Sequence, residues 1–583
     1  MKSKKKHETH DTMNQRPWFC SSLERLSGLD ADAPMFRTMH GDGSIVVRSR
    51  AKVLEMVRRL AASLREMGVA RGHIVLVDTA LCNEALMVWC ACMWLGAAAE
   101  FLPVDMRQRD RFNALAQARS AQNAPVAVLV QSPKQAKAYH EHDAEAPVIY
   151  IDAEADGVAA DQILGWPLPE NIMRFELAAE PRNIDIPQQI VLDDDETAAF
   201  VYSQGTHGEA RRAAISHAML RDQAEDLADC WKIETGDCLF MRLSSVQTVA
   251  LVVFATALFS GAAMALDAGQ NVADAYLALG ATHVFLIPRD LAKLRADILS
   301  PRAPSASGQK WRNISLALAK FRTRNVKPYL KWTSPLIDKL CLVPIKKAYF
   351  STVRVVISFG SNFDSKVGEL FGFLNVPVYN AYTSCEVGFV HIHAFMGTGG
   401  FLKSVEPRIR SGILSIKPRR GNTPFVSTND FVFEDDRCGL CVRRDSAVTL
   451  ADGDVIFTTP MHDILCRNDI IDEILIFGES RPFLTALVYL NRDAAERWAN
   501  AHRIDAGTFD QIAKNPQVYQ HVLGFVESCN KMRAIKESIH KIAILPKPIE
   551  DDPYILSPCY LTRPAEAERR YSAIIESFYI DNF

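Results

Sequence analysis

The stretch "FVYSQGTHGEARRAAISH" (residues 200–217) joins a short apolar run to a loop of Ser, Gly, Thr and His, which two arginines and a helix start follow. Such a loop presents backbone N–H groups and hydroxyls, which bind phosphate oxygens well. Loops of Gly and Ser are common, so this signal is weak alone and its context must decide the interpretation. The candidate phosphate-contacting residues are Ser203, Gly205, Thr206 and Gly208.

Helical and strand patterns alternate on both sides of this loop. Residues 53–69, "VLEMVRRLAASLREMGV", space their apolar side chains as a helix does, whereas "HIVLVDTA" (73–80) has the pattern of a short buried strand. A strand is also expected at 125–132, and residues 282–299 have the pattern of a strand followed by a helix. This alternation predicts an α/β fold whose large N-terminal domain contains largely parallel sheets.

The pattern changes to short strands near residue 430, with examples at 412–418 and 430–436. Two more strand patterns follow, and then a helical one at 493–502. These features predict a smaller α+β domain at the C-terminus, connected by a hinge near Arg443. We therefore divide the chain into a polar basic tail (1–17), a large domain (18–442) and a mobile C-terminal domain (443–583).

Composition limits the classes of partner. A net charge of −3 over 583 residues creates no overall field that would attract nucleic acid, so no nucleic-acid partner is expected. The 13 cysteines are odd in number and several lie in apolar runs, which indicates reduced thiols in a cytoplasmic protein. Cys438 and Cys441 form a CxxC pair, but zinc would need a second ligand pair and none lies nearby. The sequence does not indicate an oligomeric state.

Two stretches bear on membrane contact. Residues 248–266 carry no charge over nearly the length of a membrane span, but Gly261 interrupts them, and we favour a buried helix followed by a buried strand. Residues 301–350 are rich in Lys and Arg against a single acid, Asp338, with two tryptophans interleaved. This basic segment is either a solvated insert or a surface that contacts an anionic membrane.

Further motifs give the loop its context. In chain order they are "VRVVISFGSNFDSKVGELFGFL", "VPVYNAYTSCEVGF", "STNDFVFEDDRCGLCVRRDSAV", "FGESRPFLTALVYLN" and "YILSPCYLTRPAEAERRYSAIIESFY". In this order they resemble the adenylate-forming superfamily of acyl- and aryl-activating enzymes, and most of all the long-chain fatty acyl-CoA synthetases. The resemblance implies a two-step reaction. ATP and a carboxylate give an acyl-adenylate and pyrophosphate, and a thiol, usually coenzyme A, then takes the acyl group.

The resemblance assigns a role to the opening loop. Its family counterpart reads roughly Y-T-S-G-T-T-G-x-P-K-G and holds phosphate. Gly205, Thr206, Gly208 and the hydroxyl of Ser203 are kept, whereas Gln204 stands in place of a hydroxyl. Arg211 keeps the positive charge of the family lysine, as a planar fork instead of a point charge.

The family's Y-G-x-T-E segment corresponds to residues 382–386. The resemblance implies that Tyr382 stacks near adenine and that Glu386 binds Mg²⁺. Cys385 replaces a threonine that contacts the α-phosphate, and a thiol is a weaker hydrogen-bond donor than a hydroxyl. The family's glycine pair beside adenine reads Phe359–Gly360 here. The phenyl ring of Phe359 either fills part of the adenine slot or belongs to the core.

The ribose-binding aspartate of the family corresponds to Asp430 in "STND", with Asp454 as a competing candidate. The order of motifs favours Asp430, because the charged hinge that begins at Arg443 should follow the ribose aspartate. A carboxylate accepts hydrogen bonds from two ribose hydroxyls well, so the resemblance implies that this part of the site is intact.

The last motif departs most from the family. Long-chain members carry a lysine that neutralises charge on the carboxylate and α-phosphate during adenylation, and Leu561 occupies that position here. A leucine can neither carry charge nor donate a hydrogen bond. Arg563 lies two residues further on, on the same side if the segment is a strand, and is a candidate substitute.

Three functions are compatible with these motifs. The first is a divergent ATP-dependent ligase, using Mg²⁺ and coenzyme A, that activates fatty acyl substrates. The second is a non-catalytic acyl or nucleotide binder that serves as a scaffold. The third is an enzyme that retains only the thiol-transfer half-reaction. The expected location is the cytoplasm, with peripheral membrane contact through residues 301–350 as an option.

Overall fold

The computed structural model describes most of residues 18–580. Outside the described residues lie 1–17, 153, 156–157, 166–168, 181–184, 191, 204–210, 243–245, 268–270, 300–342, 361–364, 396, 421–423, 433–440, 444–446, 467, 505–507, 532, 553, 557–561 and 581–583. The proposed basic tail and most of the basic segment therefore lie outside the described residues.

The largest sheet of the described residues has nine strands, and the central ones run parallel. Antiparallel strands close both of its edges. In spatial order the strands are β18 (Gly399–Phe401), β17 (Gly388–Ala394), β16 (Val378–Ser384), β15 (Val355–Phe359), β14 (His283–Leu286), β12 (Cys238–Met241), β13 (Ala263–Asp267), β1 (Pro34–Met39) and β2 (Ile45–Ser49).

A second sheet has seven strands and is parallel except for its β10–β11 edge. Its order is β11 (Arg212–Ser216), β10 (Thr197–Tyr202), β4 (Ala98–Phe101), β3 (Ile74–Asp78), β5 (Val128–Val130), β6 (Val148–Tyr150) and β9 (Ile172–Arg174). A small appendage follows β6 in the chain and comprises β7 (Glu154–Ala155), β8 (Val158–Ala159) and α7 (Ala160–Leu164).

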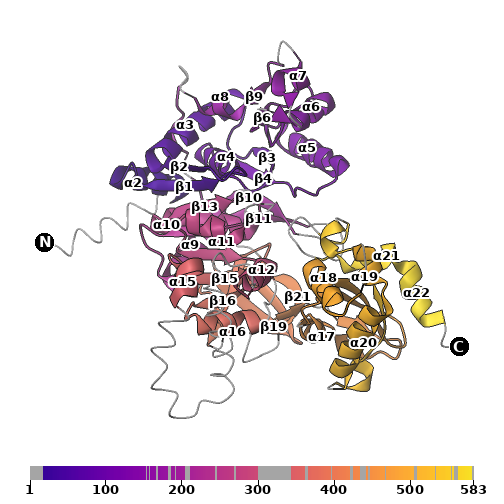
Figure 1. The fold of residues 1–583 in the computed structure, drawn as a ribbon. Helices are drawn as coiled ribbons and strands as arrows, with labels where there is room; N and C mark the ends of the chain where they lie inside the picture. Colours follow the sequence, from indigo (N-terminus) through magenta and orange to yellow (C-terminus); the bar gives the residue numbers. More distant parts are fainter. Residues whose placement is uncertain are drawn as a thin grey trace.

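A central core lies between the two sheets and contains side chains from both. Successive side chains of a strand point to opposite faces, so a strand can also contribute to a second core on the outer face of its sheet. In β12, for example, Leu239 and Met241 belong to the central core, while Phe240 belongs to the outer one. The helices that contribute to the central core are α2 (Trp18–Leu29), α3 (Arg50–Glu66), α4 (Asn83–Trp94), α8 (Phe175–Ala179), α9 (His217–Trp231) and α10 (Thr248–Ser260). In Figure 1, β6 and β9 of the seven-stranded sheet lie towards the top, and β15 and β16 of the nine-stranded sheet lie further down.

Other helices cover the outer faces of the two sheets. The nine-stranded sheet is covered by α11 (Val272–Ala278), α12 (Pro288–Leu299), α15 (Val343–Phe350) and α16 (Ser365–Phe373). The seven-stranded sheet is covered by α5 (Gln108–Gln122) and α6 (Pro133–His142). Strands buried on both faces explain why the sequence shows continuous apolar runs where strands occur.

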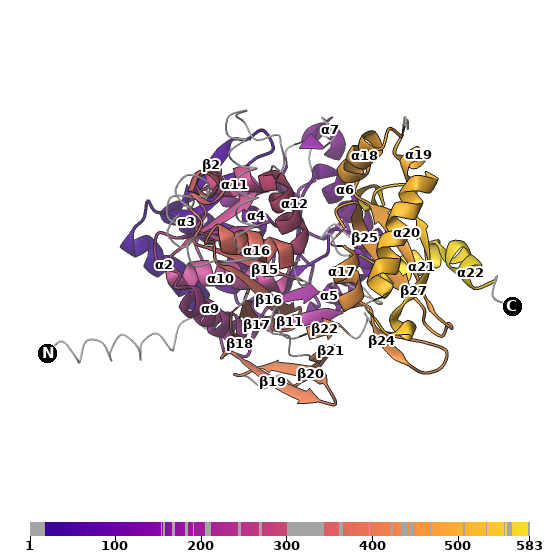
Figure 2. The same cartoon turned by 60° about the horizontal axis from the view of Figure 1, so that its bottom comes forward.

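The C-terminal part begins beyond a four-stranded antiparallel sheet, which Figure 2 shows projecting at the bottom of the molecule. That sheet comprises β19 (Val405–Arg410), β20 (Ile413–Pro418), β21 (Val426–Val432) and β22 (Cys441–Arg443). The hairpin β23 (Ala447–Thr449) and β24 (Val455–Phe457) follows, and then a three-stranded sheet of β25 (Ile471–Phe477), β26 (Leu484–Leu490) and β27 (Ile539–Ile544).

Helices enclose this three-stranded sheet on both faces. One face packs against α17 (Thr459–Leu465), α18 (Arg492–Ala501), α19 (Phe509–Ala513) and α20 (Pro516–Asn530). The other face packs against α21 (Pro564–Arg570) and α22 (Ser572–Ile580). The described part of this domain also contains two short 3₁₀ turns, η5 (Ile535–Glu537) and η6 (Ile549–Asp551).

The predicted fold class is confirmed: a large α/β domain with mostly parallel sheets precedes a smaller α+β domain. The uncharged stretch at 248–266 forms the buried helix α10, left-handed Gly261 and strand β13, as favoured from the sequence. Among the described residues, no helix has both the length and the apolarity that crossing a bilayer requires. The domain division at 442/443 stays a prediction.

The buried His217 at the start of α9 predicts a pH-dependent stability. Burial, opposed by Glu196 and Asp194 and reinforced by Arg221, lowers the pKa of His217 from 6.5 to about 4. Between these values the unfolded chain binds a proton that the folded chain does not, so stability falls as pH drops from 6.5 towards 4. Between pH 6.5 and 4, we expect the free energy of unfolding to fall by up to about 3 kcal/mol less in His217→Gln than in the wild type.

Urea unfolding of the wild type and of His217→Gln between pH 7 and about 4 measures this effect. His540→Gln, at an exposed position, is the matched control. If His217→Gln and the wild type lose stability in parallel as the pH falls, the buried imidazole is not responsible.

Candidate functional site

A hydrogen bond between two of the candidate residues lies at the centre of the site. Tyr382 is in β16 of the nine-stranded sheet and Asp430 is in β21 of the four-stranded sheet. The phenol of Tyr382 donates to Oδ2 of Asp430, whose exposed fraction is only 6%. The Thr428 hydroxyl accepts from the backbone N–H of Asp430 at 3.1 Å and donates to the Leu414 carbonyl at 2.9 Å. The structure thus fixes a buried carboxylate beside an aromatic ring.

The strand register also brings Arg443, where the sequence predicts a hinge, to this point. Asp430 in β21 lies directly opposite Arg443 in the antiparallel strand β22. The competing candidate Asp454 lies elsewhere, after the turn that joins β23 and β24, and pairs there with Lys536. Because Asp430 contacts Tyr382 while Asp454 belongs to a separate ion pair, the geometry favours Asp430 as the member of the site.

The carboxyl ends of β15 and β16 lie next to Tyr382. These parallel strands pair Phe359 with Ala381, so Gly360 follows immediately beside the Tyr382 strand. Gly360 has a φ of 98°, and a Cβ there would meet no atom within 4 Å. Phe359 is 2% exposed and belongs to the central core, which favours the core interpretation over a ring that fills the site. Ligands in parallel sheets commonly bind at such carboxyl ends.

Cys385 and Glu386 follow directly after β16. The Thr248 hydroxyl donates to the carbonyl of Cys385, and the Ser384 hydroxyl accepts from the N–H of Val387 at 3.2 Å. Burial, helped by the charge of Glu386, raises the pKa of the Cys385 thiol to about 12. A thiol with so high a pKa stays protonated near neutral pH and is a poor nucleophile. Glu386 is half-buried beside it.

The two ends of the opening loop meet at the mouth of the β10–β11 hairpin. The N–H of Ser203 donates to the Arg211 carbonyl at 2.8 Å, and the N–H of Arg211 donates to Oγ of Ser203 at 2.8 Å. The side chain of Arg211 is exposed. Gly205, Thr206 and Gly208 lie outside the described residues. The structure thus defines the base of this loop.

A buried glutamate supports that base, and our reading of the sequence missed it. Glu100 is 3% exposed and accepts from the Tyr202 phenol at 2.5 Å and from Arg212 at 2.9 and 2.8 Å. The guanidinium carbon of Arg212 lies 3.4 Å from the ring centroid of Phe200. Burial and the adjacent Glu100 raise the pKa of the Tyr202 phenol above its usual range. The available signal was a single acid in the apolar run "AAAEF", since a buried charge needs partners.

Arg563 contacts a different part of the large domain. Its guanidinium pairs with Asp105, which follows β4, and its N–H donates to the Ile555 carbonyl at 2.8 Å. Leu556 and Thr562 pair in an antiparallel bridge, and Leu561 between them lies outside the described residues. A second ion pair between the domains joins Arg289 to Glu550 at 2.6 Å. In this structure, Arg563 therefore connects the C-terminal domain to the large domain.

The chain belongs to the AMP-binding enzyme family. The family model of the AMP-binding enzymes matches residues 38–410, and the model of their C-terminal domain matches residues 445–582. This confirms the resemblance to adenylate-forming enzymes that the motifs predicted.

Relatives among characterised proteins are long-chain acyl ligases at low identity. The long-chain-fatty-acid–CoA ligase FadD15 of Mycobacterium bovis is 22% identical over 269 residues, which cover 42% of this chain and 45% of that protein. The long chain acyl-CoA synthetase 2 of Arabidopsis thaliana is 20% identical over 457 residues, which cover 70% of this chain and 68% of that protein. The match therefore spans less than half the length of the mycobacterial ligase.

Solved structures share the whole architecture. The adenylation domain of a carboxylate reductase from Mycobacterium chelonae gives a TM-score of 0.70 at 15% identity, covering 96% of this chain and 90% of that one. ATP-bound MatB from Rhodopseudomonas palustris gives 0.66 at 17% identity, covering 95% and 99%. At these identities the likeness establishes the fold alone.

Glu100 gives a prediction about the base of the loop. We expect Glu100→Ala to lower the free energy of unfolding by about 1–3 kcal/mol, because Tyr202 and Arg212 would both lose a charged acceptor. Glu170→Ala, at an exposed position, should change it by less than about 0.5 kcal/mol. Urea denaturation of the full chain measures both values. A Glu100→Ala variant as stable as the wild type would contradict a supporting role.

Proposed function

We propose that this chain is an ATP-dependent acid–thiol ligase that activates a fatty acid and passes it to a thiol such as coenzyme A. The observation that carries the proposal is the hydrogen bond from Tyr382 to the buried carboxylate of Asp430. An aromatic ring beside a fixed carboxylate suits a nucleoside, because the ring can stack on a base and the carboxylate can accept from ribose hydroxyls. Membership of the AMP-binding family and ATP-bound MatB among its structural neighbours support the choice of adenosine.

The remaining groups fit a reaction at the α-phosphate. The carboxylate of the acid attacks the α-phosphorus, pyrophosphate leaves, and a thiol then attacks the acyl carbonyl and releases AMP. Ser203, Arg211 and the loop between them would contact the departing phosphates. Glu386 supplies a hard oxygen ligand of the kind that Mg²⁺ prefers, and bound Mg²⁺ would neutralise phosphate charge. Acyl-ligase relatives support a fatty acyl substrate.

In the proposed site, the groups expected to contact phosphate depart from the family pattern more than the groups expected to contact the nucleoside. Cys385 offers a protonated thiol where the resemblance expects a hydroxyl, and Leu561 offers no charge where it expects lysine. We therefore propose a slow or specialised ligase.

A second candidate follows from Arg563. Arg563 is the candidate substitute for the family lysine, but its guanidinium is already paired with Asp105. This pairing favours a nucleotide binder that has lost adenylation, or an enzyme confined to thiol transfer.

Asp430 gives the most direct prediction for nucleotide binding. We expect Asp430→Ala to weaken AMP or ATP binding by about 1–3 kcal/mol, because ribose hydroxyls would lose a charged acceptor. Asp454→Ala, a matched control in the β23–β24 hairpin, should bind as the wild type does. Titration calorimetry measures both. Equal affinity in Asp430→Ala and loss in Asp454→Ala would show that the ribose site has been misplaced.

Leu561 gives a prediction for the chemical step. A lysine at this position would bring positive charge to the carboxylate–phosphate junction, where negative charge accumulates in the transition state. We expect Leu561→Lys to lower the barrier by about 1–4 kcal/mol and so to raise the rate of ATP–pyrophosphate exchange with a panel of fatty acids. The experiment compares it with the wild type at saturating ATP.

Two further variants identify any substitute charge. If Arg563 replaces the lysine, Arg563→Ala alone lowers exchange, and Asp105→Asn, which frees the guanidinium, raises it. Exchange that stays at background in all four proteins, together with measurable nucleotide binding, would refute the ligase and favour the second candidate.

A further inference from the structure

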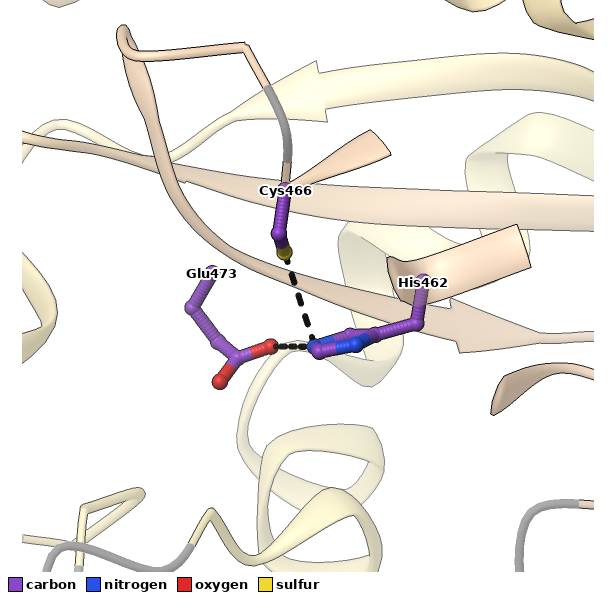
Figure 3. A group of neighbouring side chains, drawn as sticks. All are labelled: His462, Cys466 and Glu473. Atoms are coloured by element: carbon purple, nitrogen blue, oxygen red, sulfur yellow. Dashed lines mark hydrogen bonds and ion pairs between the residues drawn. The ribbon is translucent and has the colours of Figure 1, made fainter. Parts of the chain in front are cut away.

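Three side chains of metal-binding type converge in the C-terminal domain, apart from the Tyr382–Asp430 pair. His462 is on α17, Cys466 is the residue that ends this helix, and Glu473 is on the neighbouring strand β25 (Figure 3). Nε2 of His462 lies 2.5 Å from Oε1 of Glu473 and 3.6 Å from Sγ of Cys466. All three candidate ligand atoms lie within 4.8 Å of one another.

Local structure aims these side chains at one point. Residues four apart share a helix face, which places Cys466 beside His462, and the N–H of Cys466 donates to the His462 carbonyl at 2.9 Å. On β25 the pairing with β26 shifts register between Ile471 and Glu473, and such bulges redirect side chains. The N–H of Ile474 then donates to Oε1 of Glu473 at 3.0 Å, which orients the carboxylate.

The 2.5 Å contact between Nε2 and Oε1 is a hydrogen bond, and the approach of Sγ to 3.6 Å from the same nitrogen brings a third atom of ligand type beside it. A ring nitrogen of neutral histidine either carries one proton or offers one lone pair. With a proton on Nε2, Glu473 is a good acceptor but the sulfur of Cys466 is a poor second one. A metal ion at the point of convergence would instead accept a lone pair from each of the three groups.

The Nε2–Sγ and Nε2–Oε1 distances can be compared with those of a tetrahedral site. With metal–nitrogen and metal–oxygen bonds of about 2.0 Å and a metal–sulfur bond of about 2.3 Å, tetrahedral ligand atoms lie about 3.3–3.6 Å apart. The separation of Sγ and Nε2 already has this value. The carboxylate of Glu473 would withdraw by less than about 1 Å, which a small side-chain rotation provides.

We propose that His462, Cys466 and Glu473 bind a divalent transition-metal ion of the zinc class. Imidazole and thiolate ligands favour such an ion over Mg²⁺, which prefers oxygen ligands. The His462 and Glu473 side chains are 36% and 20% exposed, so an ion can enter and water can occupy a fourth position. The ion would tie α17 to β25 and so stabilise the C-terminal domain, independently of nucleotide chemistry.

The test uses the full chain after chelator treatment, with excess Mg²⁺ present throughout. Zn²⁺ is titrated calorimetrically, and Co²⁺ is used as a spectroscopic probe. We expect one equivalent of Zn²⁺ to bind and to raise the thermal midpoint, and Co²⁺ to give a thiolate-to-cobalt charge-transfer band.

Three variants and a matched control assign the site. Cys466→Ser, Glu473→Gln and His462→Ala should each weaken Zn²⁺ binding at least about tenfold, and Cys466→Ser should abolish the charge-transfer band. Cys230→Ser, at an exposed cysteine, should leave both unchanged. Cys466→Ser and Glu473→Gln nearly preserve shape, and equal metal-free thermal midpoints would show that they fold. A wild type without the charge-transfer band, or a Cys466→Ser or Glu473→Gln variant that binds Zn²⁺ as tightly as the wild type, would overturn the proposal.

Discussion

The hydrogen bond between Tyr382 and Asp430 joins the nine-stranded sheet to the four-stranded sheet at a buried carboxylate. A carboxylate that is 6% exposed costs several kcal/mol unless donors satisfy it, so Asp430 requires the phenol that β16 presents. The strand β22, which carries Arg443 opposite Asp430, is the last strand before the C-terminal domain. The predicted nucleoside-binding groups and the last strand before the smaller domain therefore meet at one buried acid.

Other contacts hold the remaining parts of the site in place. Glu100 anchors the base of the opening loop through Tyr202 and Arg212, and the pair of Arg563 with Asp105 holds the C-terminal segment against the large domain. Cys385 is partly buried beside Glu386, and this burial raises the pKa of its thiol. Together these contacts hold in place the described groups of the proposed nucleoside site, while Cys385 and Leu561 stand where the family pattern has a hydroxyl and a lysine.

The sequence predicted the fold well because its parallel strands are buried on both faces and the helices between them keep a regular apolar spacing. Asp430 could be preferred to Asp454 from the order of motifs alone. The partners of Glu100 and Arg563 could not be predicted, because Asp105 and Arg563 lie 458 positions apart and only the packing of two domains brings them together. The cluster around His462 was missed for a local reason: a register shift in β25, invisible in an alternating pattern, redirects Glu473.

We propose that the chain keeps a nucleoside site while its contacts to phosphate are weakened. Calorimetric titration of the wild-type chain with AMP and with ATP–Mg²⁺ tests it most directly. AMP is expected to bind measurably and ATP no more than about tenfold tighter, a difference of about 1.4 kcal/mol, because Cys385 and Leu561 replace a hydroxyl and a lysine. ATP binding many orders of magnitude tighter than AMP, or no binding of AMP at all, would contradict it.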